Sequence, residues 1–313
     1  MSRRINKVAL VGVGAVGASF AYAMVNQGTI EELVLIDVRR EKAEGEVLDL
    51  QQGSSLTNSH TKISVGDYKD CGDADIVVIT AGFPQLPGET RIDLVAKNAK
   101  IFKEMVGEIM ASGFDGIFVI ASNPVDIMAK LVWKYSGLPK ERIIGSGTIL
   151  DTARFRQMLG SYFDVDPRDV NAYIMGEHGD TSFPAWSHAY IGVEPVLSIV
   201  EKKGLDMAEL DQIGVDVMRA AYEIINRKGA TYYAIGLGLA RIVRAIVRDE
   251  NAVLTVGVNL EGEYGVNDMV VGVPAVINRD GIARVIELDL SDKEKDQMAF
   301  SYKALADVYN TLD

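Results

Sequence analysis

Histidine is the side chain best suited to move a proton near neutral pH, and the sequence has three: His60, His178 and His188. His60 lies in a polar stretch and is expected on the surface. His178 stands in the glycine-flanked segment GEHGD at 176–180, directly after the apolar run 172–175. A histidine at such a strand end faces a cleft and can act as a general acid–base. A lone histidine there more often has a structural role, so the functional interpretation requires partners.

Asp151 and Arg154 are candidate partners, in the segment LDTARFR at 150–156. They are three positions apart, so on a helix they share a face. Such a pair is usually a surface salt bridge, and that alternative stays open. In the functional interpretation, Asp151 accepts a hydrogen bond from the His178 ring and raises its pKa, while the planar fork of Arg154 grips a substrate carboxylate.

A loop with two prolines and two glycines, AGFPQLPGETR, spans residues 81–91. It follows a predicted strand end, so we expect it to form a lid over a cofactor crevice. Arg91, at its far end, would swing in and polarise a substrate carbonyl. The segment ASNPVD at 121–126 ends another predicted strand at the same edge, and Asn123 there can donate a hydrogen bond to the reacting oxygen.

A phosphate-binding turn is predicted at 12–17, where GVGAVG follows a strand and opens a helix. Gly12 permits the tight turn, Gly14 lets the backbone approach a pyrophosphate, and Gly17 lets the helix pack close to the strand. The free N–H groups at the start of the helix then face the phosphates. The pattern alone is weak, and a simple tight turn is the alternative.

Asp37 strengthens the nucleotide interpretation because it ends the next predicted strand, 20 residues after Gly17. A carboxylate there accepts hydrogen bonds from both ribose hydroxyls and repels a 2′-phosphate. NAD is therefore favoured over NADP as the cofactor, although Arg39 and Arg40 leave the second open.

The first half of the chain alternates between strand and helix patterns. Apolar strands are predicted at 8–13, 33–36, 76–80 and 117–120, with helices at 15–27, 41–51 and 92–110. This alternation predicts an α/β fold with a doubly wound parallel sheet, the Rossmann arrangement, and an NAD-binding domain over residues 1–145.

The pattern changes after about Gly145. Helices are predicted at 152–160, 207–228, 232–248 and from Ser291 to the end, strands at 252–258, 269–277 and 284–288, and a turn at 278–281. We therefore expect a mixed, partly antiparallel α/β (α+β) catalytic and substrate domain over residues 146–313.

Composition excludes several classes of function. The 44 acidic side chains outnumber the 32 of Lys and Arg, which gives a net charge of −12. A surface this negative repels nucleic acid and anionic membranes, so neither is an expected partner. The single cysteine, Cys71, cannot form an internal disulfide, and no secretory signal is recognisable. A cytoplasmic protein is the expectation.

The segments 12–17, 121–126, 150–156, 176–180 and 228–235 together resemble the L-lactate/malate dehydrogenase family, in order and over essentially the whole chain. The resemblance implies reversible, NADH-dependent reduction of pyruvate to L-lactate, as in glycolysis and fermentation, by a homotetramer without a metal. It implies that His178 is the proton donor and acceptor, Asp151 its partner, Arg154 the carboxylate clamp and Arg91 the polarising lid residue. It also implies a cofactor site with further lining residues: Val16, Lys42, Tyr68, Gly82, Phe83, Ser122, Asn123 and Ser146.

Gln85 is expected to select the substrate, because malate dehydrogenases resemble this sequence but carry an arginine there. A neutral Gln85 cannot pair with the second carboxylate of oxaloacetate, and an unpaired buried charge costs several kcal/mol. Thr231 similarly matches the lactate branch and leaves room for a methyl group. A related dehydrogenase for malate or a branched 2-hydroxy acid stays open, as does a catalytically silent NAD-binding protein.

Arg156 and His188 resemble positions that bind fructose 1,6-bisphosphate in activated bacterial lactate dehydrogenases. Arg156 is two positions after Arg154, so on a helix it points to another face. The alternative is a surface ion pair for Arg156 and a packing role for His188. The resemblance makes fructose 1,6-bisphosphate an expected allosteric activator.

Overall fold

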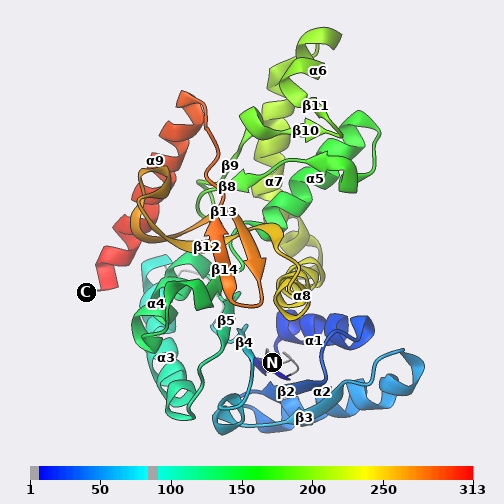
Figure 1. Cartoon of the computed structure of the whole chain (residues 1–313), viewed down its shortest axis with the longest axis vertical. Helices are drawn as coiled ribbons and strands as arrows, with labels where there is room; N and C mark the ends of the chain where they lie inside the picture. Colours follow the sequence, from blue (N-terminus) through cyan, green and yellow to red (C-terminus); the bar gives the residue numbers. More distant parts are fainter. Residues whose placement is uncertain (1–6, 84–90, 313) are drawn as a thin grey trace.

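A nine-stranded sheet is the centre of the computed structural model, which describes residues 7–83 and 91–312, with only the backbone of Arg91 and Ile92. Its order is β14-β13-β12-β6-β5-β4-β1-β2-β3 (Figure 1). The six strands of the first half are mutually parallel: β1 Lys7–Val11, β2 Glu32–Ile36, β3 Lys62–Val65, β4 Ile76–Ile79, β5 Ile117–Ile120 and β6 Ile143–Gly145. The predicted Rossmann arrangement is confirmed.

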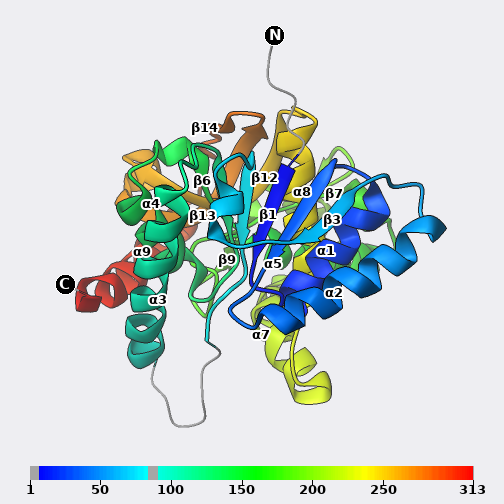
Figure 2. The same cartoon turned by 90° about the horizontal axis from the view of Figure 1, so that it is seen from below.

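Helices cover both faces of this parallel sheet, which is why its strands are almost entirely apolar. Figure 2 shows α1 and α2 on one side of the strands, and α3 and α4 on the other. Their bounds are Ala15–Gln27, Arg40–Gly53, Arg91–Ala111 and Val125–Ser136. Ile76, Val77, Val78 and Ile79 of β4 are 0% exposed, so this strand is the centre of the core.

The second half continues the same sheet with antiparallel strands. These are β12 Ala252–Glu261, β13 Asn267–Asn278 and β14 Gly281–Val285. Gly257 of β12 pairs with Gly145 of β6, so the sheet passes from parallel to antiparallel without a break. The predicted turn at 278–281 joins β13 to β14.

The predicted strand at 284–288 is wrong in its position, because β14 ends at Val285. The hydroxyl of Tyr264 donates to the Ile286 carbonyl at 2.7 Å and accepts from the Leu288 N–H at 2.9 Å. These backbone groups are therefore bonded to a side chain instead of a neighbouring strand.

The other helices are α5 Ile149–Phe163, α6 Val196–Lys203, α7 Met207–Lys228, α8 Tyr233–Val247 and α9 Asp292–Tyr309. Short strands are β7 Val170–Asn171, β8 Ile174–Met175, β9 Phe183–Pro184, β10 Tyr190–Ile191 and β11 Glu194–Pro195. One-turn 3-10 helices lie at Ser54–Leu56, Tyr68–Cys71, Lys140–Arg142, Pro167–Asp169, Trp186–His188, Glu263–Gly265 and Asn310–Leu312. A second apolar cluster, which includes Phe155, Trp186 and Val217, joins α5 to α7. Within the described ranges, no helix combines the length and apolar character that a membrane crossing requires.

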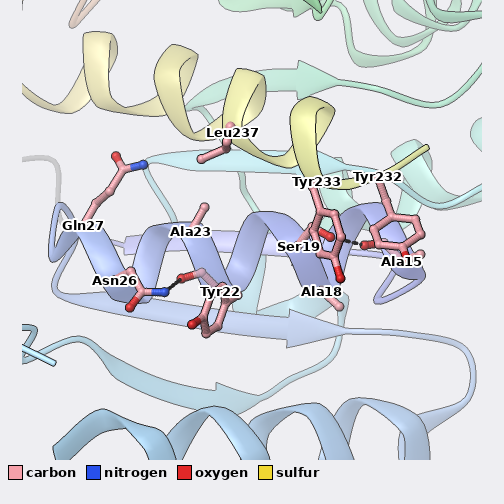
Figure 3. Close-up of a pocket in the computed structure, with 10 residues that line it drawn as sticks. All are labelled: Ala15, Ala18, Ser19, Tyr22, Ala23, Asn26, Gln27, Tyr232, Tyr233 and Leu237. Atoms are coloured by element: carbon pink, nitrogen blue, oxygen red, sulfur yellow. Dashed lines mark hydrogen bonds between the residues drawn. The ribbon is translucent and has the colours of Figure 1, made fainter. Parts of the chain in front are cut away.

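An exposed groove of about 690 Å³ runs between α1 and α8, which pack against each other. We call it the α1–α8 groove (Figure 3). Its apolar lining includes Tyr22, Tyr233 and Leu237, which are 64%, 67% and 57% exposed. None of its lining residues is a predicted catalytic or cofactor-binding residue.

Candidate active site

The turn between β1 and α1 requires glycine at two of its three motif positions. Gly12 has a φ of +96°, and a Cβ there would approach the Ala81 nitrogen to 2.5 Å. A Cβ on Gly17 would collide with the Gly12 carbonyl oxygen. Gly14 is the N-cap of α1, and a Cβ there would meet nothing within 4 Å. The open space lies at the glycine whose backbone is expected to approach a pyrophosphate, so the turn fits a dinucleotide.

The Asp37 carboxylate lies directly beside this turn. Its Oδ2 accepts a hydrogen bond from the Val13 N–H at 2.9 Å, and its Oδ1 accepts from the Arg39 N–H at 2.9 Å. The Asp37 side chain is 9% exposed, whereas that of Arg39 is 71% exposed. Asp37 is thus fixed next to the phosphate-binding turn, where a ribose would follow the pyrophosphate.

The remaining candidate cofactor residues lie on several neighbouring elements. Val16 is on α1, Lys42 on α2 and Tyr68 in the 3-10 helix Tyr68–Cys71; burial raises the pKa of Tyr68, with Glu108 adding to the shift. The Ser122 hydroxyl is buried and donates to the Ala81 carbonyl. Ser146 is 3% exposed and follows β6. Gly82 lies beside Ser122, and the half-exposed Phe83 ring has the Lys97 ammonium 4.3 Å from its centroid.

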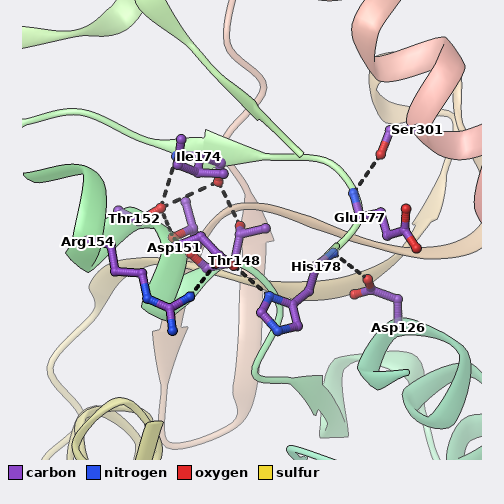
Figure 4. Close-up of polar contacts among 10 residues, drawn as sticks. Asp126, Thr148, Asp151, Thr152, Arg154, Ile174, Glu177, His178 and Ser301 are labelled. Carbon is purple, nitrogen blue, oxygen red and sulfur yellow. Dashed lines mark hydrogen bonds and ion pairs between the residues drawn. The ribbon is translucent and has the colours of Figure 1, made fainter. Parts of the chain in front are cut away.

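His178, Asp151 and Arg154 form one connected group. The sequence predicted the contact between His178 and Asp151. The ion pair between Asp151 and Arg154 is the alternative that the sequence left open, although the pair is buried and not on the surface. The distance from His178 Nδ1 to Asp151 Oδ2 is 2.6 Å, and that from Arg154 Nη1 to Asp151 Oδ1 is 3.1 Å. Figure 4 shows the imidazole and the guanidinium converging on this carboxylate. The His178 side chain is 26% exposed and those of Arg154 and Asp151 are 11% and 7% exposed, so the ring retains access to solvent while its partner is buried.

The charges of this group shift two pKa values in opposite directions. The charge of Asp151 raises the pKa of His178 by more than burial lowers it. Burial alone would raise the pKa of Asp151, but the charge of His178 and the hydrogen bonds of the group outweigh burial and lower it. The pair therefore favours an imidazolium beside a carboxylate, the state in which a histidine can protonate a substrate oxygen.

Three buried hydroxyls hold the Asp151 helix against the strand that leads to His178. Thr148 donates to the Ile174 carbonyl at 2.7 Å, Thr152 accepts from the Ile174 N–H at 3.0 Å, and Thr255 donates to Thr152 at 2.8 Å. These residues were not singled out from the sequence. Their only signal was a pair of threonines flanking Asp151 at the start of a helix.

The backbone of the histidine loop is held by two further side chains that sequence analysis did not assign. Ser301 of α9 accepts a hydrogen bond from the Glu177 N–H at 2.6 Å. Asp126 of α4 accepts one from the His178 N–H at 2.8 Å. Asp126 was within the quoted segment ASNPVD, but nothing local indicated its partner.

Asn98 joins Phe83, at the start of the segment predicted to form a lid, to the turn that carries Asn123. Its Oδ1 accepts from the Phe83 N–H at 2.9 Å, and its Nδ2 donates to the Asn123 carbonyl at 3.2 Å. The Asn123 side chain is exposed just after β5. Arg91 begins α3, but its side chain, like all of Gln85, lies outside the described residues. Thr231 is partly exposed in the link between α7 and α8.

Arg156 contacts the segment Ala172–Tyr173, outside the group of His178, Asp151 and Arg154. Its Nε donates to the Ala172 carbonyl at 3.0 Å, and its guanidinium carbon lies 5.2 Å from the centroid of the Tyr173 ring. His188 Nδ1 is 2.9 Å from the Ser187 hydroxyl. His60 is exposed, as predicted.

Comparison with known proteins matches both halves of the chain. Residues 6–145 match the model of the lactate/malate dehydrogenase NAD binding domain, and residues 148–312 that of the lactate/malate dehydrogenase alpha/beta C-terminal domain. L-lactate dehydrogenase 2 of Bacillus anthracis is 59% identical over 306 residues, which cover 97% of this chain and 98% of the relative. An L-lactate dehydrogenase of Bacillus velezensis is 57% identical over 309 residues, 98% of each chain.

A solved structure shows the same likeness in three dimensions. The minor L-lactate dehydrogenase from Enterococcus mundtii, in its ligands-bound form, superposes with a TM-score of 0.97 at 49% identity and covers 99% of both chains. The likeness therefore extends over both halves of the fold, including the histidine loop at 176–180 in the second half.

Proposed function

Since this chain belongs to the lactate/malate dehydrogenase family, we propose how its own residues carry out the NAD-dependent interconversion of pyruvate and L-lactate. The observation that carries the proposal is the hydrogen-bonded group of His178, Asp151 and Arg154. It places a proton donor and a carboxylate-binding fork on one buried anchor, which is what reduction of a 2-keto acid needs.

The His178 imidazolium donates its proton to the carbonyl oxygen of pyruvate, and the neutral ring accepts the hydroxyl proton of L-lactate in the reverse direction. Asp151 holds the ring through Nδ1, so that Nε2 faces the substrate. Bound NADH supplies the hydride to the carbonyl carbon. Arg91 and Asn123 stabilise the negative charge that develops on the oxygen.

The cofactor is held by the turn between β1 and α1 and by Asp37. The N–H groups at the start of α1 bind the pyrophosphate, for which Gly14 leaves room, while Gly12 and Gly17 allow the tight turn and the close packing of the helix. Asp37 binds the ribose hydroxyls and disfavours NADP. Val16, Lys42, Tyr68, Gly82, Phe83, Ser122, Asn123 and Ser146 complete the cofactor site.

The substrate is bound by the Arg154 fork through its carboxylate, and its methyl group faces Gln85 and Thr231. Neither of these side chains carries the positive charge that a second substrate carboxylate would need. Pyruvate is therefore preferred to oxaloacetate.

In this proposal, residues 1–145 form the cofactor-binding domain and residues 146–313 form the catalytic domain.

A substrate panel tests this function directly. NADH oxidation is followed with pyruvate, oxaloacetate and a branched 2-keto acid, for the wild type and for His178→Asn. The expected result is the highest kcat/KM with pyruvate and the loss of that activity in the variant. A higher kcat/KM for oxaloacetate would contradict the substrate assignment, and no turnover with any of the three acids would contradict catalysis itself.

We also propose that the chain assembles as a homotetramer in the cytoplasm. The α1–α8 groove supports self-association, because exposed apolar patches of this kind often mark surfaces that another protein chain covers. Sedimentation of the wild type and of Leu237→Glu would test this, with a smaller species expected for the variant. An identical mass for both would remove this groove from the interface.

Activation by fructose 1,6-bisphosphate is the last element of the proposal. Arg156 and His188 lie outside the His178 group, and neither makes an ion pair with a carboxylate within residues 7–83 and 91–312. The other N–H groups of Arg156 and the Nε2 of His188 would bind a phosphate group, held between two subunits across a two-fold axis.

A further inference from the structure

Asp126 is a buried carboxylate next to the proposed proton donor, and the mechanism above does not use it. It is 1% exposed and lies in the first turn of α4. Its Oδ2 accepts the hydrogen bond of the His178 N–H at 2.8 Å, across 52 positions of sequence. Carboxylates are almost never this buried unless they are paired, so this contact indicates a specific task.

Two carboxylates from different parts of the chain hold His178 from two sides (Figure 4). Asp151 of α5 binds the ring at Nδ1, while Asp126 of α4 binds the backbone N–H. Together they fix the imidazole and the main chain of one residue. The orientation of the ring therefore depends on both.

The same turn carries Asn123, three positions before Asp126. Asn123 is proposed to donate a hydrogen bond to the oxygen that His178 protonates. By binding the His178 backbone, Asp126 keeps these two donors at a constant separation although they come from different halves of the chain.

We propose that Asp126 is a positioning residue for proton transfer. It keeps the His178 main chain at a fixed position relative to Asn123 and places a second negative charge beside the imidazole. The proposal rests on the proposed role of His178.

Charge balance around the ring supports this role. The charged groups that face His178 within the described residues are Asp126 from α4, and Asp151 and Arg154 from α5; Glu177 precedes it in its own loop and accepts from the Thr181 hydroxyl. Asp151 raises the pKa of His178 most strongly, and burial lowers it. The charge of Asp126 raises this pKa further, whereas the positive charge of Arg154 lowers it. Loss of the Asp126 charge therefore lowers the pKa of His178.

The test compares Asp126→Asn with Asp126→Ala in the full-length enzyme. Asparagine keeps an oxygen acceptor for the His178 N–H and removes only the charge, whereas alanine removes both. Asp75→Asn is the matched control, because Asp75 also accepts a backbone N–H, that of Lys7 at 3.1 Å, at the opposite end of the strands. The measurement is the pH dependence of kcat/KM for pyruvate reduction and lactate oxidation, together with NADH affinity and Tm.

Pyruvate reduction needs the imidazolium, so its rate declines as pH rises through the pKa of His178. Asp126→Asn is expected to lower this midpoint by roughly half a pH unit or more. The pH at which the rate of lactate oxidation rises should fall by the same amount. Asp126→Ala should also lower kcat at every pH, by about 10-fold, since the His178 N–H loses its acceptor. Asp75→Asn should keep the wild-type midpoint.

The proposal would be overturned if the pH midpoint of Asp126→Asn lay within about 0.2 pH units of the wild-type midpoint while NADH binding stayed intact. It would also be overturned if Asp75→Asn shifted the midpoint by as much as Asp126→Asn. His178→Asn separates the two levels of inference. If it stays active, the proposed function fails; if it is inactive while Asp126→Asn is unshifted, only the role of Asp126 fails.

Discussion

Asp151 binds His178 and Arg154 through different oxygens of one carboxylate: Oδ2 lies 2.6 Å from His178 Nδ1, and Oδ1 lies 3.1 Å from Arg154 Nη1. Because the ring donates its Nδ1–H to Asp151, the proton exchanged with substrate belongs to Nε2. The same carboxylate thus orients the proposed acid–base group and the proposed carboxylate clamp, and fixes their separation.

His178→Asn should abolish turnover and leave NADH binding nearly intact. Asparagine cannot transfer a proton at neutral pH, so kcat is expected to fall by ~10²–10⁴-fold. Steady-state kinetics and fluorescence titration with NADH measure the two properties. His60→Asn, at an exposed position, is the control and should behave like the wild type. A His178 variant that keeps more than about a tenth of kcat would refute the assigned role.

Asp151→Asn should lower the pH at which pyruvate reduction declines, and by more than Asp126→Asn does. The charge of Asp151 is the largest cause that raises the pKa of His178, so without it the imidazolium persists only to a lower pH. We also expect kcat to fall by ~10–100-fold as the ring loses its anchor. The measurement is a pH–rate profile. Asp166→Asn is the control, because Asp166 is an exposed carboxylate that forms an ion pair with Arg168. An unmoved midpoint would contradict the charge argument.

Gln85→Arg should move the preference from pyruvate towards oxaloacetate. The new cation would pair with the second carboxylate of oxaloacetate and would stay unpaired beside the methyl group of pyruvate. The quantity to measure is the ratio of kcat/KM for the two acids. Gln212→Arg, on the exposed side of α7, adds the same charge elsewhere and should leave the ratio unchanged. A change of less than a factor of about two in Gln85→Arg would mean that this position does not select the substrate.

Gly12→Ala and Gly14→Ala should separate folding from cofactor binding. At Gly12 the φ of +96° and the approach of Ala81 predict a loss of at least about 1–2 kcal/mol of stability. Gly113→Ala controls for the backbone alone, because its φ is +90° but a Cβ would meet nothing within 4 Å. It should destabilise the protein less than Gly12→Ala does.

Gly14→Ala should keep the wild-type Tm without cofactor, since a Cβ there meets no protein atom within 4 Å. Its affinity for NADH should fall, because that Cβ occupies the space through which the pyrophosphate approaches the backbone. Thermal unfolding and NADH titration are the two measurements. Wild-type NADH affinity in Gly14→Ala would place the phosphates elsewhere.

Fructose 1,6-bisphosphate at millimolar concentration should raise the apparent affinity for pyruvate, measured at pH 6 and at pH 8. The guanidinium of Arg156 and the ring of His188 would donate hydrogen bonds to its phosphate oxygens. Replacing both Arg156 and His188 should remove the effect while sparing the maximal rate at saturating pyruvate. If pyruvate affinity is the same with and without the bisphosphate at both pH values, the activator assignment is wrong.

Local sequence was sufficient for the features that short-range physics controls. The turn at 12–17 and the helix 15–27 follow from glycine sterics and apolar periodicity, and both stand where they were predicted. The helix 207–228 likewise matches α7 residue for residue. Asp151 and Arg154 were expected on one face of a helix because helix geometry determines which residues share a face, and there they form an ion pair.

Contacts between distant parts of the chain were decided only by the tertiary structure. The hydrogen bond from His178 to Asp126 spans 52 positions and that from Glu177 to Ser301 spans 124, and neither leaves a mark in local periodicity. The end of β14 at Val285 also depends on a distant hydroxyl, that of Tyr264. The sequence by itself thus determined which residue types could do the chemistry. The packing of α4, α5 and α9 around one loop decided how His178 is held, because a hydrogen bond depends on distance in space and not on separation along the chain.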